Sequence, residues 1–173
     1  MKKYELTSEF KMFLGRKLFR IRALISFGNV EKGDLGGYIE KEENLSHEGN
    51  AWVCGNAEVC GNAKVCGNAE VCGNAKVCGN AKVCGNAEVY GNAKVYGDAD
   101  ILTITGLGTV HRTTTAFRTE KEVMISCGCF YGNIEKFRKQ VKDTRGGKVQ
   151  EEYLKFAELI EVYFGLKQEG RDE

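Results

Sequence analysis

The chain contains no proline among its 173 residues, and it has few histidines (two) and only one tryptophan. The absence of proline argues against a proline-rich disordered chain, and 22 glycines predict many tight backbone bends. Lysine and arginine number 25 against 24 aspartates and glutamates, a net charge of +1 that removes any general attraction to nucleic acid or an anionic membrane. No apolar run approaches the ~18 residues of a membrane helix, and the first residues lack an apolar signal region. We therefore expect a cytoplasmic protein with no membrane partner and no nucleic-acid partner.

A six-residue repeat, x-Gly-Asn-Ala-x-Val, dominates residues 48–101. Ala and Val stand two residues apart in each copy, so they share one face of a short strand, and the residue between them points outward and is mostly charged. Gly-Asn supplies the bend, because Gly adopts positive φ freely and Asn tolerates it. Each copy therefore predicts one short strand and one turn. The nine glycines are Gly49, Gly55, Gly61, Gly67, Gly73, Gly79, Gly85, Gly91 and Gly97.

The spacing in Val59-Cys60-Gly61-Asn62-Ala63-Lys64 resembles the aliphatic-x-x-x-small-x pattern of hexapeptide-repeat proteins. That resemblance implies a mainly β fold, a left-handed parallel β-helix, with three strands in each coil. Nine hexads then make three coils, and residues 18 apart stack. The stacking predicts an amide ladder of Asn56, Asn74 and Asn92, a favourable pair of Glu58 with Lys76, and an unfavourable pair of Lys64 with Lys82.

Six of the eight cysteines occupy one slot of the repeat, directly after each Val, and Tyr90 and Tyr96 fill the same slot further along. Stacking brings these cysteines into disulfide range in pairs. The tyrosines show that the slot does not require a thiol, and a cytoplasmic location disfavours disulfides, so we expect free structural thiols, with disulfides as the alternative. A straight column of thiols does not converge tetrahedrally, so no metal is expected. The stacked pairs are Cys54 with Cys72, Cys60 with Cys78, and Cys66 with Cys84.

The non-repeating ends predict two further units. Residues 1–47 form an N-terminal β cap, with a hairpin turn at Gly15-Arg16 and an alternating strand at 19–27, because an open solenoid end must be covered. Residues 48–101 form the β-helix, and residues 102–173 form a C-terminal α+β domain. The domain has strands at 103–105, 113–117 and 123–131, a helix capped by Asn133 and ended at 145–147, and a second helix at about 149–164.

Three features together resemble a family of phage and prophage proteins whose repeat number varies between similar caps. They are the N-terminal segments 18–24, 32–39 and 43–46, the Gly-Asn-Ala repeats, and Cys127-Gly128-Cys129-Phe130 with the helices that follow. The N-terminal cap and solenoid also resemble a bacterial β-helix protein classed as a transferase on its fold. The resemblance implies a phage or prophage origin and transfers no catalytic residue.

The segment after the solenoid holds the candidate ligand site. Glycines allow backbone amides to approach an anion, arginine offers a forked donor, and threonine offers hydroxyls. The alternative is a hairpin bend followed by a Thr-rich surface strand. The candidate residues are Gly106, Gly108, His111, Arg112, Thr113, Thr114 and Arg118.

Cys127 and Cys129 are candidate reactive thiols, provided that the fold brings His111 or Arg112 near them. The simpler interpretation is a strand of small residues that places Ile125, Cys127 and Cys129 on one face.

Acyl transfer is the activity most associated with left-handed β-helices, but fold alone is a poor guide to chemistry. Such enzymes use a solenoid histidine and a loop arm, whereas His47 and His111 lie outside the hexads and no insertion interrupts them. We therefore assign no catalytic residue, cofactor or metal. The leading hypothesis is a non-catalytic binding protein that engages a host macromolecule, such as a defence component, through its faces and C-terminal domain. The alternatives are a binder of a small anionic or nucleotide-like ligand, a structural spacer, and an acyltransferase-like enzyme; a homo-oligomer, trimer or dimer, is expected.

Overall fold

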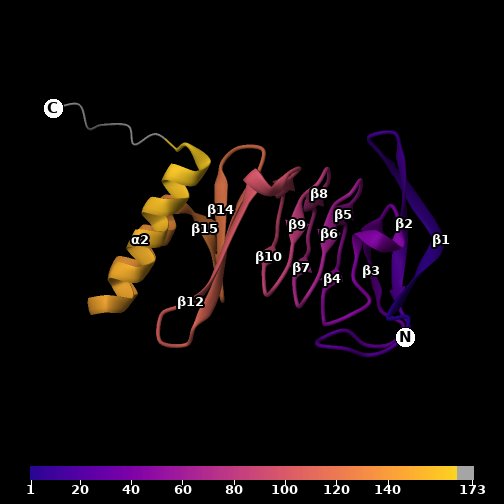
Figure 1. Ribbon diagram of the computed structural model, residues 1–173, viewed down its shortest axis with the longest axis horizontal. Coiled ribbons are helices and arrows are strands. Elements are labelled where there is room, and N and C mark those ends of the chain that lie inside the picture. The colour runs from indigo at the N-terminus through magenta and orange to yellow at the C-terminus, as the bar shows by residue number, and fades with distance from the viewer. Residues whose placement is uncertain (167–173) are drawn as a thin grey trace.

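A computed structural model describes residues 1–166 of the chain. It is an elongated, mainly β molecule in which a β-solenoid of about three turns lies between an N-terminal cap and a C-terminal sheet with helices (Figure 1). The cap comprises β1 (Tyr4–Phe13), β2 (Arg16–Ala23), β3 (Leu35–Ile39) and a short 3-10 helix, η1 (Glu42–Asn44). The strands of the solenoid are β4 (Trp52–Val53), β5 (Glu58–Val59), β6 (Lys64–Val65), β7 (Glu70–Val71), β8 (Lys76–Val77), β9 (Lys82–Val83), β10 (Glu88–Val89) and β11 (Lys94–Val95).

The solenoid strands stack in parallel at a spacing of 18 residues. One face continues from the cap as β1-β2-β3-β5-β8-β11, the second is β10-β7-β4, and the third is β6-β9. The Ala and Val of the first eight copies, from Ala51 to Val95, are buried in the interior, each no more than 1% exposed. The prediction of a strand in the ninth copy is wrong, because residues 98–100 form a 3-10 helix and Ala99 is exposed. Apolar burial and the backbone ladder therefore stabilise the stack, as the repeat predicts.

The corners of the solenoid follow from Gly-Asn. Gly61 has a φ of +68°, and a Cβ atom there would lie 3.2 Å from the backbone of Gly79 in the next coil, so glycine suits both the turn and the close stacking. The predicted amide ladder is confirmed, with Asn56 donating to Asn74 at 3.4 Å and Asn74 donating to Asn92 at 3.5 Å.

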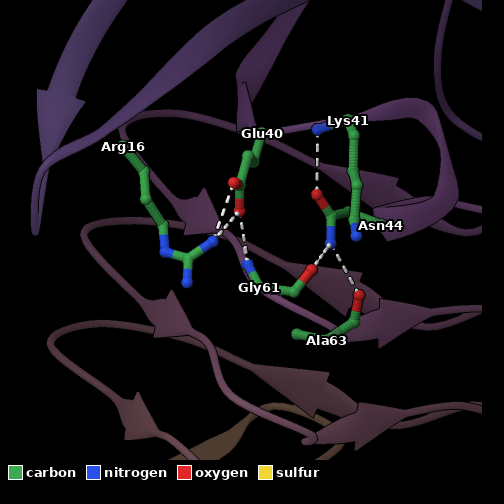
Figure 2. A network of polar contacts seen from close by, with 6 residues as sticks. All are labelled: Arg16, Glu40, Lys41, Asn44, Gly61 and Ala63. Carbon is green, nitrogen blue, oxygen red and sulfur yellow. Dashed lines mark hydrogen bonds and ion pairs between the residues drawn. The ribbon is translucent and has the colours of Figure 1, made fainter.

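Side chains of the cap replace a missing coil at the N-terminal end. The Asn44 amide, fully buried, donates to the carbonyls of Gly61 at 3.1 Å and Ala63 at 2.9 Å (Figure 2). At another corner the Lys3 ammonium donates to the equivalent carbonyls, Gly49 at 3.3 Å and Ala51 at 2.8 Å. These side chains therefore supply the donors that a preceding strand would otherwise provide.

The C-terminal sheet covers the other end of the solenoid. It follows η2 (Asp98–Asp100) and has the order β12 (Ile101–Leu107), β13 (Arg112–Arg118), β14 (Val123–Cys127), β15 (Phe130–Asn133). Phe117, Thr115 and Ser126 face the last coil of the solenoid. The Thr115 hydroxyl accepts the Glu88 amide, and the Ser126 hydroxyl donates to the Glu88 carboxylate.

The opposite face of this sheet packs against α1 (Ile134–Thr144) and α2 (Gly147–Phe164). The Asn133 side chain accepts the Lys136 amide, which confirms it as the cap of the first helix. The predicted strand over 123–131 is wrong as a single element, because Gly128 with a φ of +60° turns the chain between β14 and β15. Residues 167–173 of the predicted third segment lie outside the described residues.

The alternating pattern at residues 19–27 predicts too long a strand. β2 ends at Ala23, and Phe27 pairs only in an isolated bridge with Val30. The chain turns here to reach the cap strand β3, whose Leu35 pairs with Arg22 of β2.

The expectation of free thiols in the repeat is wrong for four of the six cysteines. Disulfides join Cys54 to Cys72 and Cys66 to Cys84, with Cα–Cα distances of 4.7 Å and 4.6 Å. Cys60 and Cys78 are free thiols, and both are buried. The 18-residue stacking that the repeat predicts is therefore sufficient to bring the pairs into bonding distance.

Candidate ligand-binding groove

Two adjoining cavities lie between the hairpin turns of the C-terminal sheet and its two helices. The first, of about 300 Å³, lies between the β12–β13 turn and the start of α2. The second, of about 60 Å³, continues between the β14–β15 turn and α1. Four residues line both cavities, namely Arg112, Thr144, Arg145 and Tyr153, so we treat them as one site and call it the arginine groove.

The two guanidinium groups of the groove come from different elements. Arg112 begins β13 and lies directly against Gly128 of the β14–β15 turn, where a side chain would collide with it. Arg145 lies in the loop between α1 and α2. Within residues 1–166, no carboxylate lies within ion-pair distance of either guanidinium. Both positive charges are therefore available to an anionic group.

The remaining walls are apolar and aromatic. Phe130, Phe137 and Val141 line the narrower cavity, and Tyr153 separates it from the wider one. The Tyr153 hydroxyl donates to the Leu107 carbonyl at 3.4 Å. Its pKa is raised, mainly by burial and also by the neighbouring Cys127, so it stays a neutral phenol. A ligand in the groove would contact both aromatic side chains and the two guanidinium groups.

Backbone geometry at the mouth of the groove depends on glycine. Gly108 has a φ of +70°, and a Cβ atom there would lie 2.9 Å from the Tyr153 hydroxyl. Its amide donates to Glu152 at 3.1 Å, which fastens the β12–β13 turn to α2. Helix α2 starts at Gly147, after the N-cap residue Gly146, with no side-chain cap and no acidic residue in its first turn. Its amide end therefore adds to the positive field of the groove.

The structure brings some of the candidate residues together and separates others. Gly108 and Arg112 line the groove. Thr114 is buried beneath it and donates its hydroxyl to the Cys127 sulfur at 3.1 Å. Gly106 lies at a bulge in β12, and its carbonyl oxygen lies 3.4 Å from Nδ1 of the exposed His111 ring.

Two of the candidates point to other partners. Thr113 exchanges a hydroxyl hydrogen bond with Thr105 at 2.9 Å. Arg118 lies at the far end of β13, where it pairs with Asp100 at 3.2 Å and donates to the Phe164 carbonyl at 3.0 Å. Sequence reasoning also missed Arg145, Gln140 and Tyr153, because only the packing of the helices places them beside the hairpin turns.

The candidate thiols lie in the groove. Cys127 and Cys129 line the narrower cavity together with Arg112, so the fold does bring that cation near them. They do not share one strand face, because Cys129 lies in the turn after Gly128 and is exposed, whereas Cys127 ends β14 and is half-buried.

Neither histidine lines the arginine groove. His47 stacks on Tyr4 with ring centroids 4.3 Å apart and accepts the Lys3 amide at 3.2 Å, so it belongs to the N-terminal cap. His111 stands in an exposed turn with a φ of +50°. No group of three His, Cys, Asp or Glu residues suited to a metal ion occurs within residues 1–166.

A larger hollow of about 640 Å³ lies beside the junction of the solenoid and the C-terminal sheet. Two of its lysines are paired, Lys94 with Glu120 at 3.2 Å and Lys76 with Glu58 at 3.8 Å. This hollow therefore offers less uncompensated charge than the arginine groove.

A scan against protein-family models finds no matching family, and a search of curated proteins finds no match. The fold therefore defines the class of this protein, a β-solenoid with stacked parallel strands and two C-terminal helices. No helix among residues 1–166 has the length and apolar character needed to cross a membrane.

Proposed function

We propose that this is a non-catalytic binding protein whose arginine groove holds the anionic group of a small, flat, nucleotide-like ligand. The observation that carries the proposal is the convergence of Arg112 and Arg145, without carboxylate partners in the described chain, on a cavity walled by aromatic side chains. Guanidinium groups bind phosphate and carboxylate oxygens through paired hydrogen bonds, and an aromatic wall can hold a base or a similar ring.

The solenoid then serves as a rigid support for the groove. The left-handed coil and the phage or prophage origin stay part of this proposal, and they rest on the hexapeptide spacing and on the resemblance of both caps. A homo-oligomer remains a prediction of the same resemblance.

Isothermal titration calorimetry with inorganic phosphate and with AMP tests the proposal. We expect AMP to bind more tightly than phosphate, because only AMP uses the aromatic wall, and Arg112→Gln with Arg145→Gln to abolish the binding of both. The matched control is Lys136→Gln with Lys139→Gln, which removes two positive charges from exposed sites on α1 outside the groove. Equal binding by the double variant and the control would refute the groove as the site.

A host macromolecule is the second candidate function, and the outer face of α2 favours it. Leu159 and Val162 on this helix are 47% and 79% exposed, an apolar surface of the kind that partners cover. The test is native mass spectrometry of tagged protein drawn gently from a bacterial lysate, with Val162→Asp as the comparison. A bound protein lost in the variant supports this candidate, whereas bare protein in both samples contradicts it.

A further inference from the structure

The column of Cys60 and Cys78 differs from the two bonded columns in its chemistry but not in its backbone. Strand pairing places Val59 beside Val77, just as it places Val53 beside Val71 and Val65 beside Val83. Each of these valines precedes a cysteine of the repeat. Because the two disulfide-bonded columns have Cα–Cα distances of 4.7 Å and 4.6 Å, the same register gives Cys60 and Cys78 the separation that a disulfide requires.

What distinguishes this column is its cover. Phe13, Leu18 and Tyr38 of the N-terminal cap pack over the two thiols, which are 2% and 6% exposed, whereas the cysteines of the other columns are half-buried. The cap therefore shields one dithiol while leaving the other two columns open.

A cavity leads to the covered pair. It has a volume of about 280 Å³ and is lined by both cysteines, by Leu14 and Arg16 at the tip of the β1–β2 hairpin, and by Lys41, which caps η1. Arg16 is held by two hydrogen bonds to the Glu40 carboxylate, of 2.8 Å and 3.0 Å, and the same carboxylate accepts the Gly61 amide next to Cys60 (Figure 2).

The pKa values of the two thiols are shifted in opposite directions. The pKa of Cys60 is lowered, chiefly because it accepts a hydrogen bond from the Cys78 thiol and further because Arg16 lies near, and these effects outweigh burial and the carboxylates of Glu40 and Glu58, which raise it. The pKa of Cys78 is raised by the same hydrogen bond and by burial. The two thiols are thus unequal, as a nucleophile and a resolving thiol need to be.

We propose that Cys60 and Cys78 form a thiol–disulfide exchange site for a small disulfide that carries carboxylates, such as glutathione disulfide. The Cys60 thiolate attacks one sulfur of that disulfide, the bond between its sulfurs breaks, and one half leaves as a thiolate. Cys78 then gives its proton to the departing thiolate and attacks the Cys60 sulfur, which releases the second half as a thiolate that takes a proton from water. Two electrons pass from the protein dithiol to the small disulfide, and Lys41 attracts its carboxylates.

The test uses differential labelling of the full chain. Samples with and without glutathione disulfide are quenched in acid, unfolded and alkylated with iodoacetamide, then reduced and labelled with N-ethylmaleimide. Trypsin cuts after Lys76 and Lys82, so Cys78 is the only cysteine in the peptide of residues 77–82 and its label reports its state. We expect that peptide to change from the iodoacetamide label to the maleimide label when glutathione disulfide is present.

Two variants identify the chemistry. Cys78→Ser lacks the resolving thiol, so Cys60 is expected to accumulate as a stable glutathione adduct, visible in the intact mass. Cys129→Ser removes an exposed thiol elsewhere, and the result for residues 77–82 should not change. An iodoacetamide label on Cys78 in both wild-type samples would overturn the proposal, as would a glutathione adduct on Cys78 in the wild type without a bond to Cys60.

Discussion

Replacing Asn44 by alanine removes the side chain that closes one corner of the open solenoid end. The Asn44 amide donates to the Gly61 and Ala63 carbonyls, and its oxygen accepts the Lys41 amide at 3.0 Å. The Ala63 bond is buried, so loss of its donor costs about 1–3 kcal/mol. The other two bonds are partly buried and contribute about 0.5–1.5 kcal/mol each. We expect the free energy of unfolding to fall by about 3 kcal/mol.

Urea unfolding followed by circular dichroism, with the disulfides intact, measures this loss. The matched control is Asn62→Ala, because Asn62 lies at an exposed corner and only donates to Asn80 at 3.2 Å. The control should change the free energy of unfolding by no more than about 0.5 kcal/mol. If Asn44→Ala is no more destabilising than this control, the argument that side chains replace a missing coil is refuted.

Three further predictions concern the solenoid and its cap. Val77→Ala removes two methyl groups from a fully buried site and should lower the free energy of unfolding by about 2 kcal/mol in the same urea assay; no change would contradict the packed interior. Gly61→Ala places a Cβ atom on a backbone with a φ of +68°, close to the next coil, and should lower the midpoint of thermal unfolding. The control Lys64→Ala, at an exposed position, should leave that midpoint unchanged. Burial lowers the pKa of Lys3 to about 8, below the roughly 10.4 of an unfolded lysine, so the unfolded chain binds more protons between these values and Lys3 adds stability as pH rises from about 8 to about 10. Urea unfolding across that range should show this rise in the wild type relative to Lys3→Met; parallel curves would contradict it.

The repeat allowed much of the solenoid to be predicted because each copy combines the same local preferences with the same burial. The 18-residue stacking followed from the period, and the Asn56 ladder and the contact of Glu58 with Lys76 are both present. The cap residues Lys3 and Asn44 could not be found in this way. They act once each, through contacts with backbone groups far along the chain, and no period marks them.

The groove was only partly predictable for a related reason. Arg112 lies on a hairpin with recognisable glycines, so local chemistry pointed to it. Arg145 and Tyr153 reach the same cavity only because α1 and α2 pack on the C-terminal sheet, and the helical pattern alone does not say which turn faces which hairpin. Arg118, four positions beyond Thr114 on the same strand, illustrates the converse, since the strand carries it to the opposite end of the sheet.

The most direct test of the central claim is an amide NMR titration of the isotope-labelled full chain with AMP. If the arginine groove is the binding site, the largest chemical-shift changes will come from Gly108, Arg112, Arg145 and Gly146, and the chemical shifts of the solenoid amides will not change. Arg112→Gln should remove the changes in the groove. Shifts that cluster on the solenoid faces, or that persist in Arg112→Gln, would contradict the account.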